Sequence, residues 1–189
     1  ERLLPPPSYV AAKKISTQSY TAQLTTVELA NHYIATKNKA ANMPDSMNIE
    51  ILQTPELEIT TESNQIIFYQ LSTATKSNLI GPERHYAFCS PSQGTTSLGC
   101  RASFETPLAN SHTMSFNLTR IKDGKVQSVI TTPELQAQGG AFTIHGLTSG
   151  QYNWQLSYLA TQENTTEIPR TTIRQTGSFE LITLEAQTP

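Results

Sequence analysis

The sequence predicts an all-β protein, built mainly as an antiparallel β-sandwich, with a short helix near its N-terminus. Three observations support this class: apolar and polar residues alternate in short segments after residue 47, turn-forming residues separate these segments, and uncharged polar side chains dominate the composition. Ser, Thr, Asn and Gln account for 68 of the 189 residues, and 27 of them are Thr. Threonine is β-branched and suits the outward positions of strands, so the composition agrees with the alternation.

The strands are predicted from apolar side chains that recur at every second position, the spacing that lines one face of a strand. An Asp123-Gly124 pair after residues 114–119 is typical of a hairpin turn leading into a strand over residues 126–130. No βαβ alternation appears, which argues against Rossmann and barrel enzymes. The other segments with strand character are residues 56–61, 65–72, 86–88, 152–158 and 179–184.

The first 47 residues follow a different pattern. Thr25 and Glu28 have the spacing of a helix capping box, and Val27, Ala30 and Ile34 recur at helical spacing, so we expect a helix over residues 26–38. The prolines at positions 5–7 fit an extended spacer before it, and a disordered terminus is the alternative. We therefore expect an N-terminal arm with a short helix over 1–47 and a sandwich domain over 48–189.

Cys89 and Cys100 are separated by ten residues rich in turn formers, which could bring the two thiols together. In the chain-entropy model, a disulfide that closes this loop would stabilise the fold by about 3 kcal/mol. It would also indicate an exported protein. Two separate reduced thiols are the alternative. A redox or zinc site is disfavoured, because there is no CxxC and no histidine at zinc spacing.

The most specific segment is residues 147–156, in which Leu147 precedes a turn ending in Gly150, and Tyr152 and Trp154 open an alternating strand. It resembles the tyrosine corner of immunoglobulin-like sandwiches. Together with Gly177-Ser178-Phe179 further on, it resembles the last two strands of fibronectin type III-like domains in bacterial envelope proteins. The resemblance implies an immunoglobulin-like fold over residues 50–185, with strands A, B, F and G at 55–61, 65–72, 151–160 and 178–184.

The sequence departs from that family in two places. The tryptophan usually expected in the early core is absent, because the single Trp lies on the predicted strand F. Residues 84–112, which include the cysteine loop, have the character of an insertion or an extra hairpin.

No residue pattern indicates catalysis, so we expect a protein that is not an enzyme and needs no cofactor or metal. The four histidines lack metal-ligand spacing, there is no GxSxG, and Glu56 and Glu58 fit a solvated strand face. Thirteen basic against fifteen acidic residues argue against nucleic-acid binding, and no apolar run is long enough for a transmembrane helix. The two N-glycosylation sequons, at Asn117 and Asn164, carry little information because about two are expected by chance.

Trp154, Tyr152 and Tyr158 share one strand face, which suits a buried core better than a sugar-stacking platform. Edges poor in Lys and Pro can accept a strand from another chain, and the arm over residues 1–24, with Tyr20 and Leu24, could supply one. The loop with Gln93 and Thr95 is a further candidate interaction surface.

The sequence thus predicts a structural or interaction module of an exported bacterial envelope or cell-surface assembly. Its partners would be other protein chains or further copies of itself. A donor-strand subunit of an extracellular filament and a carbohydrate- or protein-binding surface module are the alternatives.

Overall fold

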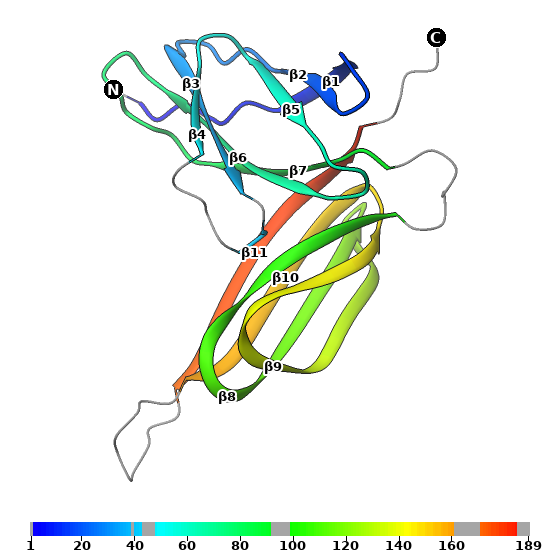
Figure 1. Cartoon of the computed structure of the whole chain (residues 1–189). Coiled ribbons are helices and arrows are strands. Elements are labelled where there is room, and N and C mark those ends of the chain that lie inside the picture. Colours follow the sequence, from blue (N-terminus) through cyan, green and yellow to red (C-terminus); the bar gives the residue numbers. More distant parts are fainter. Residues whose placement is uncertain (1, 39, 43–47, 92–98, 161–170, 185–189) are drawn as a thin grey trace.

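The computed structural model of the chain describes residues 2–38, 40–42, 48–91, 99–160 and 171–184 (Figure 1). Within these residues the regular elements are all strands, which confirms the predicted all-β class. The eleven strands are β1 (Tyr9–Lys14), β2 (Ser19–Leu24), β3 (His32–Asn38), β4 (Ile49–Leu52), β5 (Glu56–Thr60), β6 (Ile67–Ala74), β7 (Arg84–Cys89), β8 (Cys100–Lys122), β9 (Lys125–Leu147), β10 (Gly150–Ala160) and β11 (Thr171–Thr183).

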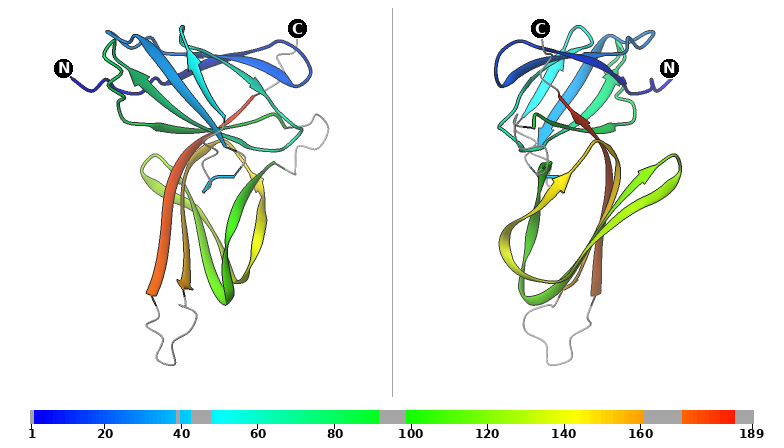
Figure 2. Two further views of the ribbon diagram at one scale, coloured as in Figure 1. Left: turned by 60° about the vertical axis from the view of Figure 1, so that its left-hand side comes forward. Right: turned by 90° about the vertical axis from the view of Figure 1, so that its right-hand side faces the viewer.

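The strands form two sheets. The small sheet has the order β1-β2-β5, and the large sheet has the order β4-β3-β6-β7-β11-β10-β8-β9. All pairings in both sheets are antiparallel except that of β7 with β11, which is parallel. The long strands β8 and β9 form the predicted hairpin around Asp123 and Gly124, which both have positive φ as a two-residue hairpin turn requires. Figure 2 shows how this hairpin curls around the lower part of the molecule.

Two hydrophobic cores lie on opposite faces of the strands β6, β7 and β11. The first core lies between these strands and the small sheet, and the second lies between them and the curled strands β8–β10. The first core consists of Leu4, Tyr20, Ala22, Leu24, Val27, Tyr33, Ala35, Leu52, Leu57, Ile59, Ile67, Tyr69, Leu71, Tyr86, Phe88 and Leu184. The second core consists of Ile66, Phe68, Ala87, Cys89, Cys100, Ala102, Phe104, Phe116, Leu118, Ile144, Leu147, Tyr152, Trp154, Leu156, Phe179 and Leu181.

Alternation along the shared strands distributes their side chains between the two cores. On β7, Tyr86 and Phe88 enter the first core while Ala87 and Cys89 enter the second. Strands buried on both faces have continuous apolar sequences instead of alternating ones, which explains the unbroken run at residues 66–69. The shared strands join the two cores into one body.

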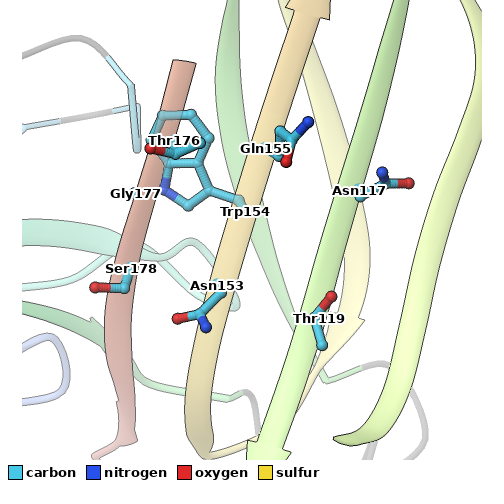
Figure 3. Close-up of a pocket in the computed structure, with 8 residues that line it drawn as sticks. All are labelled: Asn117, Thr119, Asn153, Trp154, Gln155, Thr176, Gly177 and Ser178. Carbon is cyan, nitrogen blue, oxygen red and sulfur yellow. The ribbon is translucent and has the colours of Figure 1, made fainter. Parts of the chain in front are cut away.

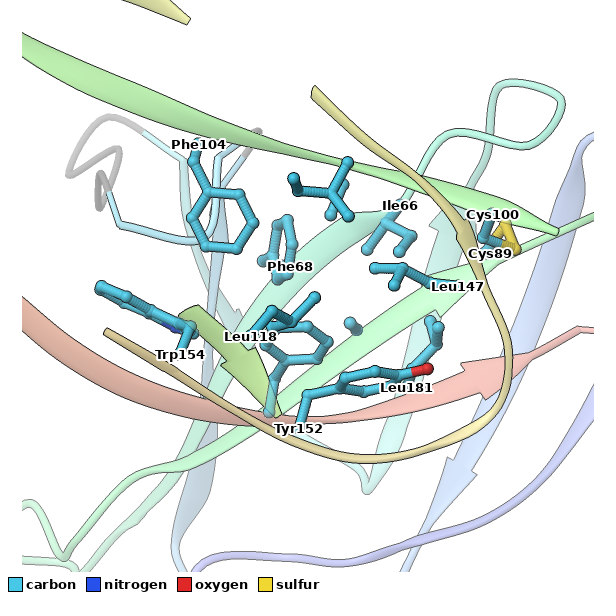
Figure 4. Close-up of a cluster of buried hydrophobic side chains, with 14 of the residues drawn as sticks. Ile66, Phe68, Cys89, Cys100, Phe104, Leu118, Leu147, Tyr152, Trp154 and Leu181 are labelled. Atoms are coloured by element: carbon cyan, nitrogen blue, oxygen red, sulfur yellow. A yellow bond between two sulfur atoms is a disulfide. The ribbon is translucent and has the colours of Figure 1, made fainter. Parts of the chain in front are cut away.

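The second core is closed because β8 and β9 bend across it (Figure 4). Phe104 and Phe116 come from the two halves of β8 and still contact each other, with ring centroids 4.6 Å apart. The ring of Phe142 on β9 packs against both, and Trp154 contacts Phe104 edge-on. One long hairpin therefore supplies two opposing walls of this core.

The predicted helix over residues 26–38 is wrong, because these residues form a turn and strand β3. Thr25 does not cap a helix: its hydroxyl accepts a hydrogen bond from the Ser8 backbone N–H at 2.8 Å. The chain reverses at Leu29, which has a φ of 69°, and Tyr33 and Ala35 then face the first core at a spacing of two. Burial of this alternating pair outweighs the helical spacing that includes Val27 and Ala30.

The N-terminal segment is packed against the body and is not the extended spacer that we expected. Leu4 lies in the first core, and its backbone contacts the position that a side chain would take at Gly81. Strand β2 pairs with β5, and β3 pairs with β4 and β6, so hydrogen bonds join residues on both sides of position 47. Strand β7, within the segment that had the character of an insertion, lies between β6 and β11.

Candidate functional site

The predicted disulfide is confirmed. Cys89 and Cys100 are bonded, with their Cα atoms 6.4 Å apart, and both are buried in the second core. The bond joins the end of β7 to the start of β8. It therefore ties the shared sheet to the hairpin that closes the second core.

Hydrogen bonds hold the turn between β9 and β10 in the segment that resembles a tyrosine corner, residues 147–156. The Tyr152 hydroxyl donates to the Thr148 carbonyl at 2.7 Å and accepts from the Thr148 N–H at 3.2 Å. Leu147 lies at the end of β9, and Trp154 follows Tyr152 by two residues on β10. Both are buried in the second core together with Tyr152. Arg120 crosses over Gly150 and donates to the Ser149 carbonyl at 2.6 Å. These contacts fix the direction in which β10 enters the sheet.

The arm residues proposed for donation to another copy are buried in their own chain. Tyr20 and Leu24 lie on β2 in the first core, and the Tyr20 hydroxyl is hydrogen-bonded to Ser90 Oγ at 2.8 Å. Strand β2 thus completes the sheet of its own molecule. Gln93 and Thr95, the other proposed interaction residues, lie outside the described residues.

The histidines for which the structure describes side chains lie apart from one another along the fold. His85 is exposed and lies 3.9 Å from Glu83, while His32 contacts the neighbouring Asn31. No group of three His, Cys, Asp or Glu side chains within the described part of the chain is arranged to hold a metal ion. No helix long and apolar enough to cross a membrane occurs in that part either.

Strand β4 forms an outer edge of the large sheet and carries exposed apolar side chains. Ile49 and Ile51 are 56% and 59% exposed. On the neighbouring strand β3, Ile34 is the residue paired with Ile51. The edges of the small sheet differ. Strand β1 ends in Lys13 and Lys14, and the outward residues of β5 include glutamates at 56 and 58. Charged side chains protect edges against pairing. Strand β4 carries one, the exposed Glu50, against two on each of the other strands, so it is the least protected of these three edges.

The charge of Glu50 on β4 affects the pKa of a buried tyrosine, Tyr69, behind this edge. Burial raises the pKa of the Tyr69 phenol to about 12, and the negative charge of Glu50 contributes to the increase. Tyr69 is nearly inaccessible to solvent in the first core. Its phenol therefore stays neutral in the folded protein well above the pH at which an exposed tyrosine ionises.

A polar cleft lies on the outer face of the sheet formed by β8, β10 and β11 (Figure 3). It has a volume of about 520 Å³. Six uncharged hydrogen-bonding side chains line it in two rows across the three strands. The pairing registers give the rows Asn117–Gln155–Thr176 and Thr119–Asn153–Ser178.

Trp154 and Gly177 lie between these rows, on the inner side of the same strands. The two residues are directly paired across β10 and β11, and the indole lies where a Cβ of Gly177 would be, with Nε1 2.6 Å from that position. Trp154 is 8% exposed and lines the cleft from below. Sequence reasoning placed Trp154 in the core but missed the polar rows, because they depend on the registers of three strands.

A second cleft of about 450 Å³ lies beside β11, between residues 41–42 and the strands β6 and β7. The side chain of Asn42 defines one wall, since it exchanges hydrogen bonds with the Glu105 backbone at 2.7 and 2.8 Å. Gln70 and His85 come from the shared sheet, and Gln175 comes from β11. Trp154 and Gly177 line this cleft as well, so the two clefts meet at this pair.

Comparisons with known proteins give little further information. No family model matches the chain, and no curated protein matches it. One similar solved structure is the "Central Fibronectin-III array of RIM-binding protein", with 12% sequence identity and a TM-score of 0.34. The match covers 98% of this chain and 71% of that chain. This TM-score is below the level typical of two chains that share a fold.

Proposed function

We propose that the protein is a non-enzymatic structural and interaction module of an exported bacterial envelope or cell-surface assembly. Its partner is another protein chain that adds an extended strand along β4. The observation that carries this proposal is the pair Ile49 and Ile51, which present apolar side chains beside a sheet edge with which no further strand of the described residues pairs. Strand addition of this kind gains affinity from backbone hydrogen bonds and specificity from alternate side chains.

Export is supported by the disulfide between Cys89 and Cys100, because such bonds persist in oxidising compartments. The structural role is supported by the strands that the two cores share, since one body with two cores can hold an edge strand rigidly in position. Strand β4 pairs along β3, which itself pairs with β6 of the shared sheet.

Site-specific photo-cross-linking tests the β4 partner. A photoreactive residue is placed at position 51 and, as a matched control, at position 10, because Val10 on edge strand β1 is 58% exposed. In the native cells, position 51 should form a discrete adduct that Ile49→Lys suppresses, while position 10 should form none. Equal adducts at both positions, or none at either, would contradict the proposal.

A filament subunit that exchanges residues 1–24 between copies is the second candidate. It is favoured by the position of β1 at the outer edge of the small sheet, beyond β2. An exchanged β2 would restore the same contacts of Tyr20 and Leu24 in the neighbouring copy. Light scattering of the purified protein should then show concentration-dependent oligomers, and a monomer at every concentration would exclude this arrangement.

A further inference from the structure

We propose that β11 accepts an extended segment of another protein chain along its unpaired edge, in the cleft between this strand and residues 41–42. The segment carries an apolar side chain opposite Gly177 and an acidic one beside Arg174. This site is separate from the β4 edge and does not depend on the function proposed for that edge. The proposal rests on the pairing of β11, on the cleft beside it and on the charge of Arg174.

The row beside β11 is only partly filled. Strand β10 pairs with β11 on one side over residues 171–181, whereas β7 pairs with it on the other side only over residues 180–183. On that second side, no strand among the described residues pairs with positions 171–179. The left view of Figure 2 shows β11 running down the side of the lower part of the molecule, with β10 next to it. An edge of this kind presents unpaired N–H and C=O groups, which readily pair with another chain.

The second cleft lies beside this part of β11. Residues 175–178 line it on one side, and residues 41–42 line it across the gap. Residues 41–42 belong to the opposite wall of the second core, because the Ala41 N–H donates to the Ser103 carbonyl of β8 at 3.0 Å and Asn42 is hydrogen-bonded to the Glu105 backbone. One wall is thus extended beyond β8, while the facing wall stops at β11. The cleft of about 450 Å³ is the place that a strand added to β11 would take.

Alternation along β11 decides which side chains of an added strand face the cleft. Gly177 pairs with Trp154, which is in the second core, so Gly177 and Gln175 lie on the inner side of β11. The Gln175 side chain accepts a hydrogen bond from Asn42 at 3.5 Å. At Gly177 the indole takes the place of a side chain at the base of the cleft. The residue opposite Gly177 would therefore point at the indole and at Ala41, which favour an apolar side chain.

The outer side of β11 adds a charge. Arg174 is exposed and adjoins the inward Gln175, so it lies on the outer side of the strand. It is the only charged residue of positions 171–179, and no acidic side chain of the described residues forms an ion pair with it. Glu180, the next charged residue on that side, lies beside β7 and outside the unpaired part. Opposite charges directly across two strands attract, so this edge favours an acidic residue beside Arg174.

The surroundings of the cleft limit the partner to a single extended segment. Gln70 on β6 and His85 on β7 close the end of the cleft next to β7, and residues 41–42 border it on the side away from β11. An edge strand of a folded sheet, such as β4 of a second copy, brings its neighbouring strands with it, and these would meet β6 and residues 41–42. A free segment has no such neighbours. It gains affinity from main-chain hydrogen bonds and specificity from its alternate side chains.

Two synthetic peptides test the proposal on the whole protein. Each consists of threonines around a central leucine, with a glutamate three residues before the leucine in one peptide and three residues after it in the other. Together they cover both strand directions. Trp154 is the single tryptophan and reports on the cleft by fluorescence, while NMR follows the amide resonances of residues 174–178. Control peptides have the same side chains but methylated backbone nitrogens.

We expect at least one of the two peptides to change both signals saturably, and its methylated version to change neither. Arg174→Glu should weaken binding of this peptide about three- to tenfold, because an attractive pair becomes a repulsive one. Replacement of the peptide glutamate by lysine should restore binding to this variant. Lys13→Glu is the matched control, because Lys13 is exposed on β1 of the small sheet, and it should change affinity less than about twofold.

The thermal midpoint of each variant is measured, so that a loss of binding is read only on folded protein. The proposal is overturned if neither peptide changes either signal at millimolar concentration, or if the methylated peptide binds equally well. It is also overturned if Arg174→Glu leaves the affinity unchanged. Self-association in sedimentation that Arg174→Glu abolishes, without any peptide binding, would assign the edge to a second copy and overturn the proposal as well.

Discussion

The indole of Trp154 occupies the space that a side chain at Gly177 would need. The two residues face each other across β10 and β11, and indole atoms lie 2.5 to 2.6 Å from the position of a Cβ on Gly177. Trp154 also packs edge-on against Phe104, with ring centroids 5.7 Å apart. This single pair therefore connects the second core to both clefts.

Gly177→Ala should lower the free energy of unfolding by about 1–3 kcal/mol, the usual cost of overpacking. The added methyl group collides with the indole, and the indole is held against Phe104. Urea unfolding of a double-mutant cycle with Trp154→Ala measures the coupling. In the Trp154→Ala background the glycine substitution should cost much less, and an equal cost in both backgrounds would show that the two residues do not interact.

Stability should fall as the pH rises from about 10 to about 12, because the pKa of Tyr69 is raised to about 12 in the folded protein. The unfolded state, with a pKa near 10, loses its proton first, so it binds fewer protons than the folded state in this window. The contribution of Tyr69 is fully present below pH 10 and amounts to about 2–3 kcal/mol. Urea unfolding at a series of pH values measures it.

Tyr69→Phe tests the assignment, because it removes the titrating group. The alkaline loss of stability should be smaller in this variant than in the wild type. Glu50→Gln should reduce the loss by a lesser amount, since burial, the larger cause of the raised pKa, remains. An unchanged profile in Tyr69→Phe would assign the alkaline loss to other groups.

Removal of the disulfide should lower the free energy of unfolding by about 3 kcal/mol, within the usual range of about 2–5 kcal/mol. The bond closes a short loop and is buried, so Cys89→Ala with Cys100→Ala also leaves a gap in the second core. Chemical denaturation of this variant, compared with the oxidised wild type, measures the loss. A difference below about 1 kcal/mol would show that the bond does not constrain the unfolded chain as the chain-entropy model requires.

Deletion of residues 1–24 should prevent the native fold from forming. It removes β1 and β2 and uncovers Leu57 and Ile59 on β5, which are fully buried in the intact protein. Several buried apolar side chains at roughly 1.5–3 kcal/mol each are comparable with the whole stability of a typical domain. NMR dispersion or near-ultraviolet circular dichroism detects the loss. A well-folded, stable protein without these residues would contradict the position of β2 in the first core.

Several strands after residue 50 could be predicted from the sequence, among them β5, β6 and β10, because each has an alternating or continuous apolar pattern that burial explains. Tyr152 and Phe179 are examples: both lie in the second core, on neighbouring strands. The first part of β8 and the part of β9 after residue 130 were not predicted. Strand β3 was missed because Val27, Ala30 and Ile34 have helical spacing, while the burial of Tyr33 and Ala35 against β6 is a tertiary effect.

The candidate sites were harder to predict because they depend on which strands become neighbours. Ile49 and Ile51 matter only because β4 ends the large sheet, and no local pattern in the sequence marks an edge. Asn117, Asn153 and Ser178 are far apart in the chain and meet only through the registers of β8, β10 and β11. Their residue types alone are typical of any solvated strand face.

The central claim is that the strands shared between the two cores make them one cooperative unit, and equilibrium unfolding of Leu57→Ala tests it most directly. Leu57 is fully buried in the first core, whereas Trp154 reports on the second. Leu57→Ala should cost about 2–5 kcal/mol and should shift the unfolding midpoint seen by Trp154 fluorescence as much as that seen by circular dichroism. A fluorescence transition that stays at its wild-type midpoint while circular dichroism shows an earlier one would contradict this claim.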